Sequence, residues 1–161
     1  MKPRVLVIAG PTASGKSALA LDLAAALDGE IICADSLTVY RGLDIGSAKP
    51  TAEQQRQIPH HLLDIREPTE PFTAADFKLA AKAAIAAICQ RGKRPILAGG
   101  TGLYLRALLR GLNDAPGEDP VLRETLRKRL ECEGAETLLA ELAKVDPDTS
   151  KRLHPNNRNR I

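Results

Sequence analysis

Aromatic residues are scarce in this 161-residue chain: Phe, Tyr and Trp together make up 2% of it, and tryptophan is absent. Proteins that hold single-stranded nucleic acid on stacked aromatic side chains need more of them, so the composition argues against that class. The core must instead be aliphatic and rich in alanine. Hydrophobic residues make up 43% of the chain and charged residues 27%, as in ordinary globular proteins, and the length suits one domain with a substantial core.

Cysteine is also rare, and long apolar runs are missing. The three cysteines, Cys33, Cys89 and Cys132, have no C-x-x-C spacing, which argues against a disulfide framework or a zinc site and predicts thiols in a reducing compartment. No apolar run approaches the length of a membrane span. The start "MKPRVLVIAGP" has only a short apolar run, so we interpret it as the first strand and not as a signal peptide. We therefore expect a cytoplasmic protein with no membrane partner.

The excess of positive charge is small. The formal net charge is +3, which by itself indicates no nucleic-acid role. Residues 151–161, "KRLHPNNRNRI", concentrate four basic residues and a histidine with no acid. Such a tail is usually a solvated end, and a segment that contacts phosphate is the less common interpretation.

Apolar runs typical of buried strands alternate with helical patterns along the first part of the chain. Strands are expected at residues 4–9, 30–34, 61–65 and 95–99. One helix is expected at about residues 15–27, and a short one after the capping box of Thr51 and Gln54. A third should run from the N-cap Thr73 to Gly92, and a fourth should begin after residue 101. Strands separated by helices indicate a parallel sheet that is covered on both faces.

The pattern changes after the turn-rich break at residues 113–120, "NDAPGEDP". Residues 121–153 are charged and helical, with Gly134 between two helices and Asp146-Pro147 at the start of a third. No strand-like run follows Gly99. We therefore predict an α/β core over residues 1–112 and the start of a helical insertion subdomain over residues 113–161.

The stretch "GPTASGKS" matches the phosphate-binding pattern G-x-x-x-x-G-K-[ST] and lies between an expected strand and an expected helix, as that pattern requires. Backbone N–H groups of the loop and of the first helical turn can hold anionic oxygens, and Lys16 adds a point charge. The Ser17 hydroxyl can bind Mg²⁺. The core is thus expected to be a P-loop NTPase-like sheet. The candidate diphosphate- or nucleotide-binding residues are Gly10, Pro11, Thr12, Ala13, Ser14, Gly15, Lys16 and Ser17.

A second motif, "ADSLTVYRGLDIGSAKP" from Ala34 to Pro50, follows the second expected strand. Open parallel sheets bind ligands at the carboxyl ends of their strands, so Asp35 should lie beside the phosphate loop. Asp35 could cap its own loop, lie near a Mg²⁺ ion or act as a general base. The spacing alone leaves these alternatives open.

Five stretches together resemble one family. "GPTASGKS", "ADSLTVYRGLDIGSAKP", "PHHLLDI", "FTAADF" and "PILAGGTGLYLRALLRGL" occur in this order in tRNA dimethylallyltransferases, and "HPNNRNRI" extends the resemblance over essentially the whole chain. That family transfers a dimethylallyl group from dimethylallyl diphosphate to N6 of the adenine at position 37 of tRNA, beside the anticodon. The resemblance implies that the phosphate loop holds a prenyl diphosphate and not ATP, and that the partner is the anticodon stem-loop of tRNA. We expect a monomer.

The resemblance also implies roles for single residues. Asp35 matches the general base, and Lys16 with a Mg²⁺ on Ser17 would stabilise the leaving diphosphate. Thr101 matches a threonine that helps to hold the target adenine, which must leave the anticodon-loop stack to reach the site. The residues that match tRNA-contacting positions are Asp35, Ser36, Leu37, Thr38, Thr101, Arg123, Asn159, Arg160 and Ile161.

Simpler interpretations exist for several residues. Thr101 could be the N-cap of the helix that begins at Gly102, and Arg123 could be a helix-surface arginine. His60 and His61 are adjacent, so their side chains should point in opposite directions, and no cluster of cysteines or acids completes a metal site. We interpret the histidine pair as structural or as support for neighbouring groups.

The chain departs from the family pattern at Thr38, where a glutamine is typical, and at Asn157, where an aspartate is typical. Ser17 replaces the commoner threonine and keeps the hydroxyl. The larger departure is length, because family members continue well past the position of Ile161, back into the α/β core and through further helices. The chain is therefore expected to stop inside the helical insertion and to lack a late part of the core.

Three other functions stay open on the sequence. An adenylate isopentenyltransferase would prenylate a free adenine nucleotide, although the helical segment and the basic residues 151–160 favour tRNA. A small-molecule kinase would bind ATP in the loop and would need an acid for the metal, for which Asp64 is a candidate. An inactive tRNA-binding fragment would bind the anticodon stem-loop or the diphosphate without turnover.

Overall fold

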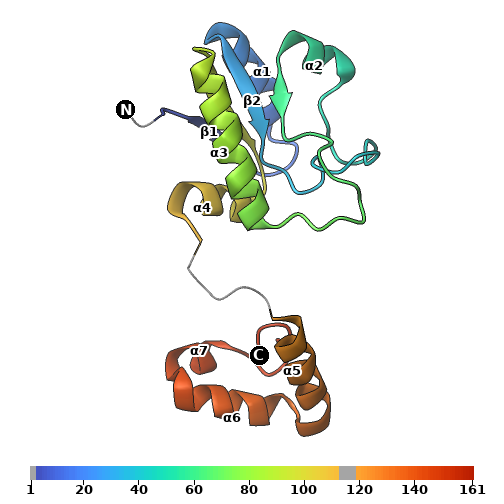
Figure 1. Cartoon of the computed structure of the whole chain (residues 1–161), viewed down its shortest axis with the longest axis vertical. Helices are drawn as coiled ribbons and strands as arrows, with labels where there is room; N and C mark the ends of the chain where they lie inside the picture. Colours follow the sequence, from blue (N-terminus) through green and yellow to red (C-terminus); the bar gives the residue numbers. More distant parts are fainter. Residues whose placement is uncertain (1–2, 113–118) are drawn as a thin grey trace. The chain divides into compact units, whose positions relative to one another are not determined.

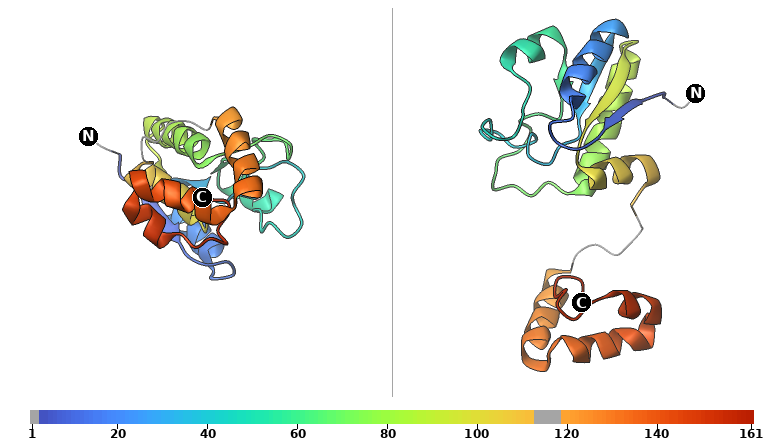
Figure 2. Two further views of the ribbon diagram at one scale, coloured as in Figure 1. Left: turned by 90° about the horizontal axis from the view of Figure 1, so that it is seen from below. Right: turned by 180° about the vertical axis from the view of Figure 1, so that it is seen from behind.

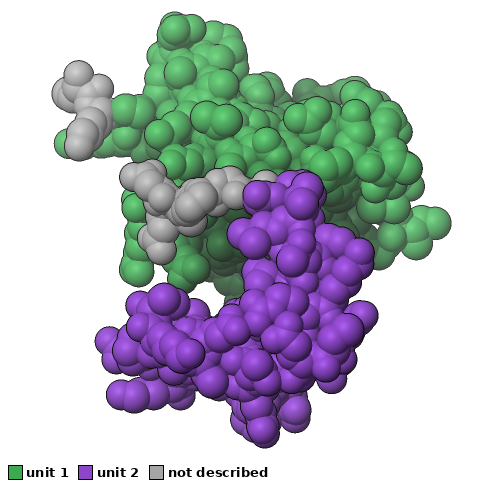
Figure 3. Space-filling model, turned by 60° about the horizontal axis from the view of Figure 1, so that its bottom comes forward, with its two compact units in different colours: residues 1–113 green, residues 114–161 purple. Residues whose placement is uncertain are grey.

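The computed structural model describes residues 3–112 and 119–161. The chain divides into two compact units, residues 1–113 and residues 114–161 (Figure 1, Figure 3). The sequence places the boundary between residues 112 and 113. The part of the turn-rich break at residues 113–118 lies outside the described residues.

The described part of the first unit is built on one parallel sheet of four strands in the order β1-β4-β2-β3 (Figure 1). The strands are β1 (Leu6–Ala9), β2 (Gly29–Cys33), β3 (His60–His61) and β4 (Arg94–Gly99). The helices are α1 (Lys16–Ala26), α2 (Ala52–Gln57), α3 (Ala74–Gln90) and α4 (Gly102–Arg110). The predicted parallel α/β core is confirmed.

Helices cover both faces of the sheet because successive residues of a strand point to opposite sides. On one face, Ile32 and Leu97 belong to a core cluster with buried residues of α3 and α4. On the other face, Ile31 and Ile96 cluster with Ala24 and other residues of α1. Figure 1 shows α3 in front of the sheet, and the view from behind in Figure 2 shows α1 in front. The near-continuous apolar runs in the sequence reflect this two-sided cover.

Two helix starts follow local capping signals. The Thr51 hydroxyl accepts a hydrogen bond from the Gln54 amide at 3.2 Å, and Gln54 Oε1 accepts one from the Thr51 amide at 2.8 Å. This is the capping box expected for α2. Thr73, the expected N-cap of α3, forms a second capping box with Asp76. Both boxes satisfy amides that a helix leaves without partners.

The third strand is placed wrongly by the sequence. The apolar run predicts a strand at residues 61–65, whereas β3 covers only His60–His61. Leu62 has a φ of 63° and Asp64 a φ of 52°, which are left-handed conformations that end an extended strand. An apolar pattern cannot reveal such a turn, because Leu rarely adopts that backbone conformation and Asp does so only occasionally.

The second unit is helical. Its described helices are α5 (Pro120–Glu133), α6 (Ala135–Val145) and α7 (Pro147–Arg152). Gly134, with a φ of 85°, separates α5 from α6, and Asp146 caps α7 by accepting a hydrogen bond from the Thr149 amide at 2.9 Å. Both agree with the sequence. Arg129 of α5 pairs with Glu141 of α6 at 2.7 Å. None of the described helices of either unit is both long enough and apolar enough to cross a membrane.

Two glycines at the carboxyl end of β4 let the neighbouring segments approach closely. A Cβ on Gly99 would lie 2.1 Å from the carbonyl oxygen of Ala34, far inside van der Waals contact. A Cβ on Gly100 would lie 3.3 Å from the carbonyl oxygen of Gly10. Since β4 lies between β1 and β2, these glycines bring the residues that follow β1 and β2 toward one place.

A buried carboxylate joins β2 to its neighbours. The Glu30 side chain is 7% exposed, and its Oε2 lies 2.6 Å from both Arg91 Nη2 and His61 Nε2. Arg91 is the C-cap of α3, so one carboxylate connects β2, β3 and α3. The hydrogen bond from Arg91 lowers the pKa of Glu30, although burial acts in the opposite direction.

Replacement of Gly99 by alanine should lower the free energy of unfolding by about 1–3 kcal/mol or more, because the added methyl group must push β2 and β4 apart. Urea unfolding followed by circular dichroism measures this change. Gly102→Ala is the matched control, since a Cβ there meets nothing within 4 Å. The control should be neutral or stabilising by up to about 1 kcal/mol. Equal effects of the two substitutions would contradict the close-approach argument.

The stability of the protein should depend on the ionisation of Glu30 in acid. Its pKa is lower in the folded state than the ordinary 4.5, so its contribution is complete above that value and is lost as the pH falls through the folded pKa. Glu30→Gln should lower the free energy of unfolding at neutral pH by about 1–3 kcal/mol.

Chemical unfolding at a series of pH values checks this prediction. Between about pH 5 and pH 3, wild-type stability should fall more steeply than that of Glu30→Gln. Glu53→Gln, at an exposed position of α2, is the control and should follow the wild-type profile. Parallel profiles for wild type and Glu30→Gln would show that the carboxylate contributes nothing.

Candidate active site

The loops after β1, β2 and β4 meet at the carboxyl ends of the strands, where open parallel sheets bind ligands. Together with residues 46–48 and Pro50 they surround a cavity of about 300 Å³. The sequence-predicted residues in its lining are Thr12, Ala13, Ser14, Gly15, Lys16, Ser17, Asp35, Leu37 and Thr38. Gly10, Pro11, Ser36 and Thr101 border these segments without lining the cavity.

The phosphate loop presents unpartnered amides to an anion. Gly15 is the N-cap of α1 with a φ of 81°, and among the described residues no side chain caps this helix. The amides of its first turn therefore have no helical acceptor, and the helix dipole favours negative charge beside them. The Lys16 ammonium donates a hydrogen bond to the carbonyl oxygen of Pro11, which holds the ammonium within the loop.

Asp35 lies on the opposite side of Gly99 and Gly100 from the phosphate loop and is half-buried in the cavity lining. Its Oδ1 accepts a hydrogen bond from the Leu37 amide at 2.8 Å, so Asp35 does cap its own turn. No described residue donates a hydrogen bond to its other carboxylate oxygen. One oxygen therefore fixes the side chain, and the second can accept a proton from a ligand.

Thr101 is tied to the segment that carries Asp35. Its amide donates to the carbonyl oxygen of Ala34 at 3.2 Å, and its hydroxyl accepts from the Ser36 amide at 3.0 Å. Thr101 is the N-cap residue of α4, but its hydroxyl makes no capping bond to that helix. The expected N-cap position of Thr101 is therefore confirmed, although its side chain does not cap the helix. The amide and the hydroxyl of Thr101 together hold the backbone on both sides of Asp35.

Cys33 forms part of the cavity lining as the last residue of β2. Burial, with the negative charge of Asp35 nearby, raises the pKa of its thiol to about 12. The thiol is therefore neutral at physiological pH and is not a nucleophile.

The two histidines have different neighbours. His61 contacts the buried Glu30, whereas His60 lines the cavity with its Nδ1 2.7 Å from the carbonyl oxygen of Ile58. Burial lowers the pKa of His60. Within residues 3–112 and 119–161, no group of three or more His, Cys, Asp or Glu side chains could hold a metal.

The residues present fit a magnesium ion better than a metal that needs a complete protein cage. Ser17 and Asp35 both line the cavity and carry oxygen donors. Mg²⁺ commonly keeps several waters and binds through one or two protein oxygens together with substrate phosphates. Such an ion would be held by Ser17 and the oxygens of a bound phosphate.

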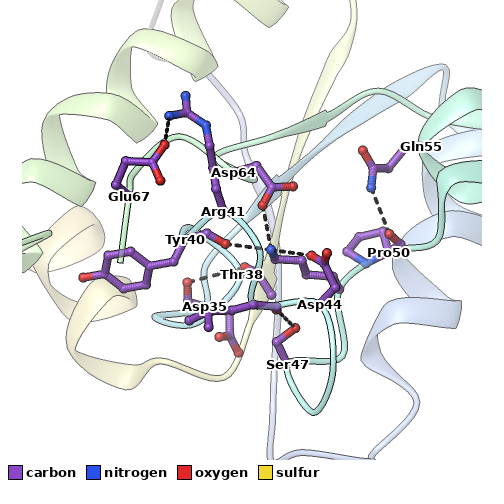
Figure 4. Close-up of polar contacts among 12 residues, drawn as sticks. Asp35, Thr38, Tyr40, Arg41, Asp44, Ser47, Pro50, Gln55, Asp64 and Glu67 are labelled. Carbon is purple, nitrogen blue, oxygen red and sulfur yellow. Dashed lines mark hydrogen bonds and ion pairs between the residues drawn. The ribbon is translucent and has the colours of Figure 1, made fainter. Parts of the chain in front are cut away.

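The long motif after Asp35 folds around one buried lysine, Lys49, whose partners Tyr40, Asp44 and Asp64 are labelled in Figure 4. Lys49 Nζ donates hydrogen bonds to the carbonyl oxygen of Tyr40 at 2.6 Å, to Asp44 Oδ1 at 2.9 Å and to Asp64 Oδ1 at 2.6 Å. Lys49 was not among the site residues predicted from the sequence. The only signal was the presence of a lysine and an acid, Asp44, in the second half of a motif rich in small and apolar residues.

The position of Asp64 weakens the kinase alternative. Asp64 was the candidate acid for a metal-bound ATP, but its carboxylate pairs with Lys49 and does not line the cavity. In that position the carboxylate supports the loop and lies outside the cavity lining.

The remaining tRNA-contact candidates gather in the second unit. Arg123 of α5 and the stretch Asn159, Arg160 and Ile161 line one cavity of about 380 Å³ within this unit. The departure at Asn157 falls in a turn formed by the backbone, in which its amide donates to the carbonyl oxygen of His154 at 2.8 Å. Arg123 and residues 159–161, which are far apart in the sequence, thus line the same cavity.

Comparison with known proteins identifies the family. A family model described as IPP transferase matches residues 38–161. A tRNA dimethylallyltransferase 1 from Trichlorobacter lovleyi is 99% identical over 161 residues, and one from Pelobacter propionicus is 55% identical over 159 residues. The matches include 100% and 99% of this chain but 53% and 52% of those proteins. The chain thus spans about half the length of the curated relatives that it matches.

Solved structures agree with the sequence matches. The tRNA isopentenylpyrophosphate transferase of Bacillus halodurans is 43% identical with a TM-score of 0.68, and the match covers 99% of this chain and 53% of that one. A eukaryotic dimethylallyltransferase acting on tRNA is 34% identical with a TM-score of 0.80, over 99% of this chain and 40% of that one. Because the family model matches most of the chain, and because these relatives share both its sequence and its fold, the chain belongs to the IPP transferase family.

Proposed function

We propose that this chain provides the donor site and the general base of an enzyme that transfers a dimethylallyl group from dimethylallyl diphosphate to N6 of the adenine at position 37 of tRNA. Membership of the IPP transferase family supports the reaction class. The observation that carries the proposal is one cavity in which the phosphate loop and the Asp35 carboxylate both line the wall.

In this mechanism Asp35 prepares the nucleophile. The exocyclic amine of adenine is weakly nucleophilic because its lone pair is delocalised into the ring. As the N6 nitrogen forms a bond to C1 of the dimethylallyl group, the carboxylate oxygen that makes no protein hydrogen bond accepts the N6 proton. The Oδ1–Leu37 hydrogen bond and the two Thr101 bonds keep the carboxylate in place during this step.

The phosphate loop stabilises the leaving group. The C1–O bond breaks with its electron pair on the diphosphate, which gains negative charge as it departs. Lys16 and the first-turn amides of α1 are suited to that charge, because they are fixed before the reaction. A Mg²⁺ ion bound at Ser17 would add positive charge next to the same oxygens.

The second unit is proposed to contact the anticodon stem-loop. Its cavity combines Arg123 with Arg158 and Arg160, and positive side chains in such a place suit phosphate oxygens of RNA. The target adenine must leave its stack to reach the first unit. We expect the enzyme to act as a monomer.

An acceptor comparison tests the proposed function. The full-length protein, with radiolabelled dimethylallyl diphosphate and Mg²⁺, should prenylate an anticodon stem-loop RNA that carries adenosine at position 37. It should leave AMP, ATP and the same RNA with guanosine at that position unlabelled. Mass spectrometry of the digested RNA should detect N6-(dimethylallyl)adenosine.

Other results of this experiment identify the alternatives. Label in AMP or ATP alone would establish an adenylate isopentenyltransferase. Hydrolysis of ATP without prenyl transfer, abolished by Lys16→Ala, would establish an ATP-dependent enzyme and overturn the proposal.

Replacement of Asp35 by asparagine should lower kcat by about 100- to 10,000-fold, since the amide cannot accept the proton. Binding of dimethylallyl diphosphate, measured by isothermal titration calorimetry, should change little because the phosphate loop is intact. Asp22→Asn, at an exposed position of α1 outside the cavity lining, is the matched control and should keep wild-type kcat. Equal losses of binding and rate in Asp35→Asn would contradict the role of a general base.

A further inference from the structure

The ammonium of Lys49 is buried and fully engaged. Its side chain is 6% exposed, although lysine ordinarily stays in water. An ammonium has three N–H donors, and the three acceptors on Tyr40, Asp44 and Asp64 match that number. Burial alone would lower the pKa of Lys49, but the hydrogen bonds to the two carboxylates raise it above its ordinary value. The group therefore stays charged and keeps its partners.

The three acceptors come from separate segments of the chain (Figure 4). Tyr40 lies early in the motif that follows β2, Asp44 lies in its middle, and Asp64 lies beyond β3. The backbone adds further links, because the amides of Asp64 and Ile65 donate to the carbonyl oxygens of Thr38 and Val39 at 3.2 Å and 2.9 Å. Lys49 thus sits where the motif and the segment after β3 are joined.

The segments that Lys49 joins form a wall of the active-site cavity. Ala48 and Pro50, on either side of Lys49 in the chain, line the cavity, as do Leu37 and Thr38. Lys49 itself does not. The Lys49 ammonium therefore holds the backbone of the cavity wall in place and does not contact a ligand in the cavity.

The backbone around Lys49 needs such a support. Ala48 has a φ of 53° and Asp64 a φ of 52°, both in the left-handed region that disfavours residues with a Cβ. Conformations of this kind persist when surrounding interactions over-determine them. The Ser47 hydroxyl, which donates to the carbonyl oxygen of Leu43, closes the same turn and is buried.

We propose that Lys49 is a positioning residue for the transfer reaction: its ammonium fixes the cavity wall that begins at Asp35, and so sets the place of the general base relative to the phosphate loop. This inference rests on the proposed function. Lys49 binds neither the diphosphate nor the tRNA, because its three donors are used within the protein.

The test compares Lys49→Met with Lys82→Met, a control at an exposed position of α3. Methionine keeps the unbranched apolar stem of the side chain and removes the ammonium group. In the full-length protein, Lys49→Met should lower kcat by about 10- to 100-fold, because a small misplacement of reacting groups is costly. The Kd for dimethylallyl diphosphate should stay within about threefold of wild type, since the phosphate loop is unchanged.

Hydrogen exchange supplies a readout that does not depend on turnover. Amides of residues 36–48 should exchange faster in Lys49→Met, while those of α3 and β4 should keep their wild-type protection. If wild type transfers no dimethylallyl group, the proposed function fails, and the exchange pattern still decides whether Lys49 holds the wall. Unchanged exchange at residues 36–48 overturns the inference.

Two further results are decisive. A tenfold or greater weakening of dimethylallyl diphosphate binding with kcat retained would make Lys49 a substrate ligand and overturn the inference. If Lys49→Met does not fold, the Asp44→Asn variant is used in its place. Asp44 is 71% exposed, and its replacement weakens only one of the three hydrogen bonds of Lys49. A smaller fall in kcat with faster exchange at residues 36–48 then supports the inference, and wild-type behaviour in both measurements overturns it.

Discussion

The close approach of β2 to the end of β4 is the constraint on which the site depends. Gly99 has no room for a side chain beside the Ala34 carbonyl, and Gly100 has little beside the carbonyl of Gly10. Because β4 is the middle strand of the three, its glycines let an anion-binding loop and a carboxylate share one small cavity. In the proposed mechanism Lys16 and Asp35 act on one ligand from two sides of this cavity.

Polar groups inside the first unit mostly hold backbone in place. Glu30 connects two strands to α3, Thr101 holds the segment around Asp35, and Lys49 joins three segments of the cavity wall. Each of these groups satisfies its donors or acceptors within the protein, which is the condition under which burial of a charge or a hydroxyl is tolerated. Rigid support of this kind suits a reaction in which reacting groups must be placed before the substrates arrive.

Local signals in the sequence predicted much of this arrangement. Some features depend on only a few adjacent residues, and the structure has them where the sequence predicts them. They are the turn between β1 and α1, the capping box of Thr51 and the break between helices at Gly134. The order β1-β4-β2-β3 and the bonds of Thr101 and Lys49 join residues far apart in the chain, so periodicity could not show them. The prediction of a strand at residues 61–65 was wrong because of contacts between distant residues as well. Hydrogen bonds to the preceding motif hold the backbone there, where Leu62 and Asp64 have positive φ values.

The bond between Lys16 and the Pro11 carbonyl leaves the ammonium with capacity for a ligand. An ammonium has three N–H donors, and this bond uses one of them. Because the long side chain is already held in the loop, binding of an anion there would cost less side-chain entropy than the ordering of a free lysine.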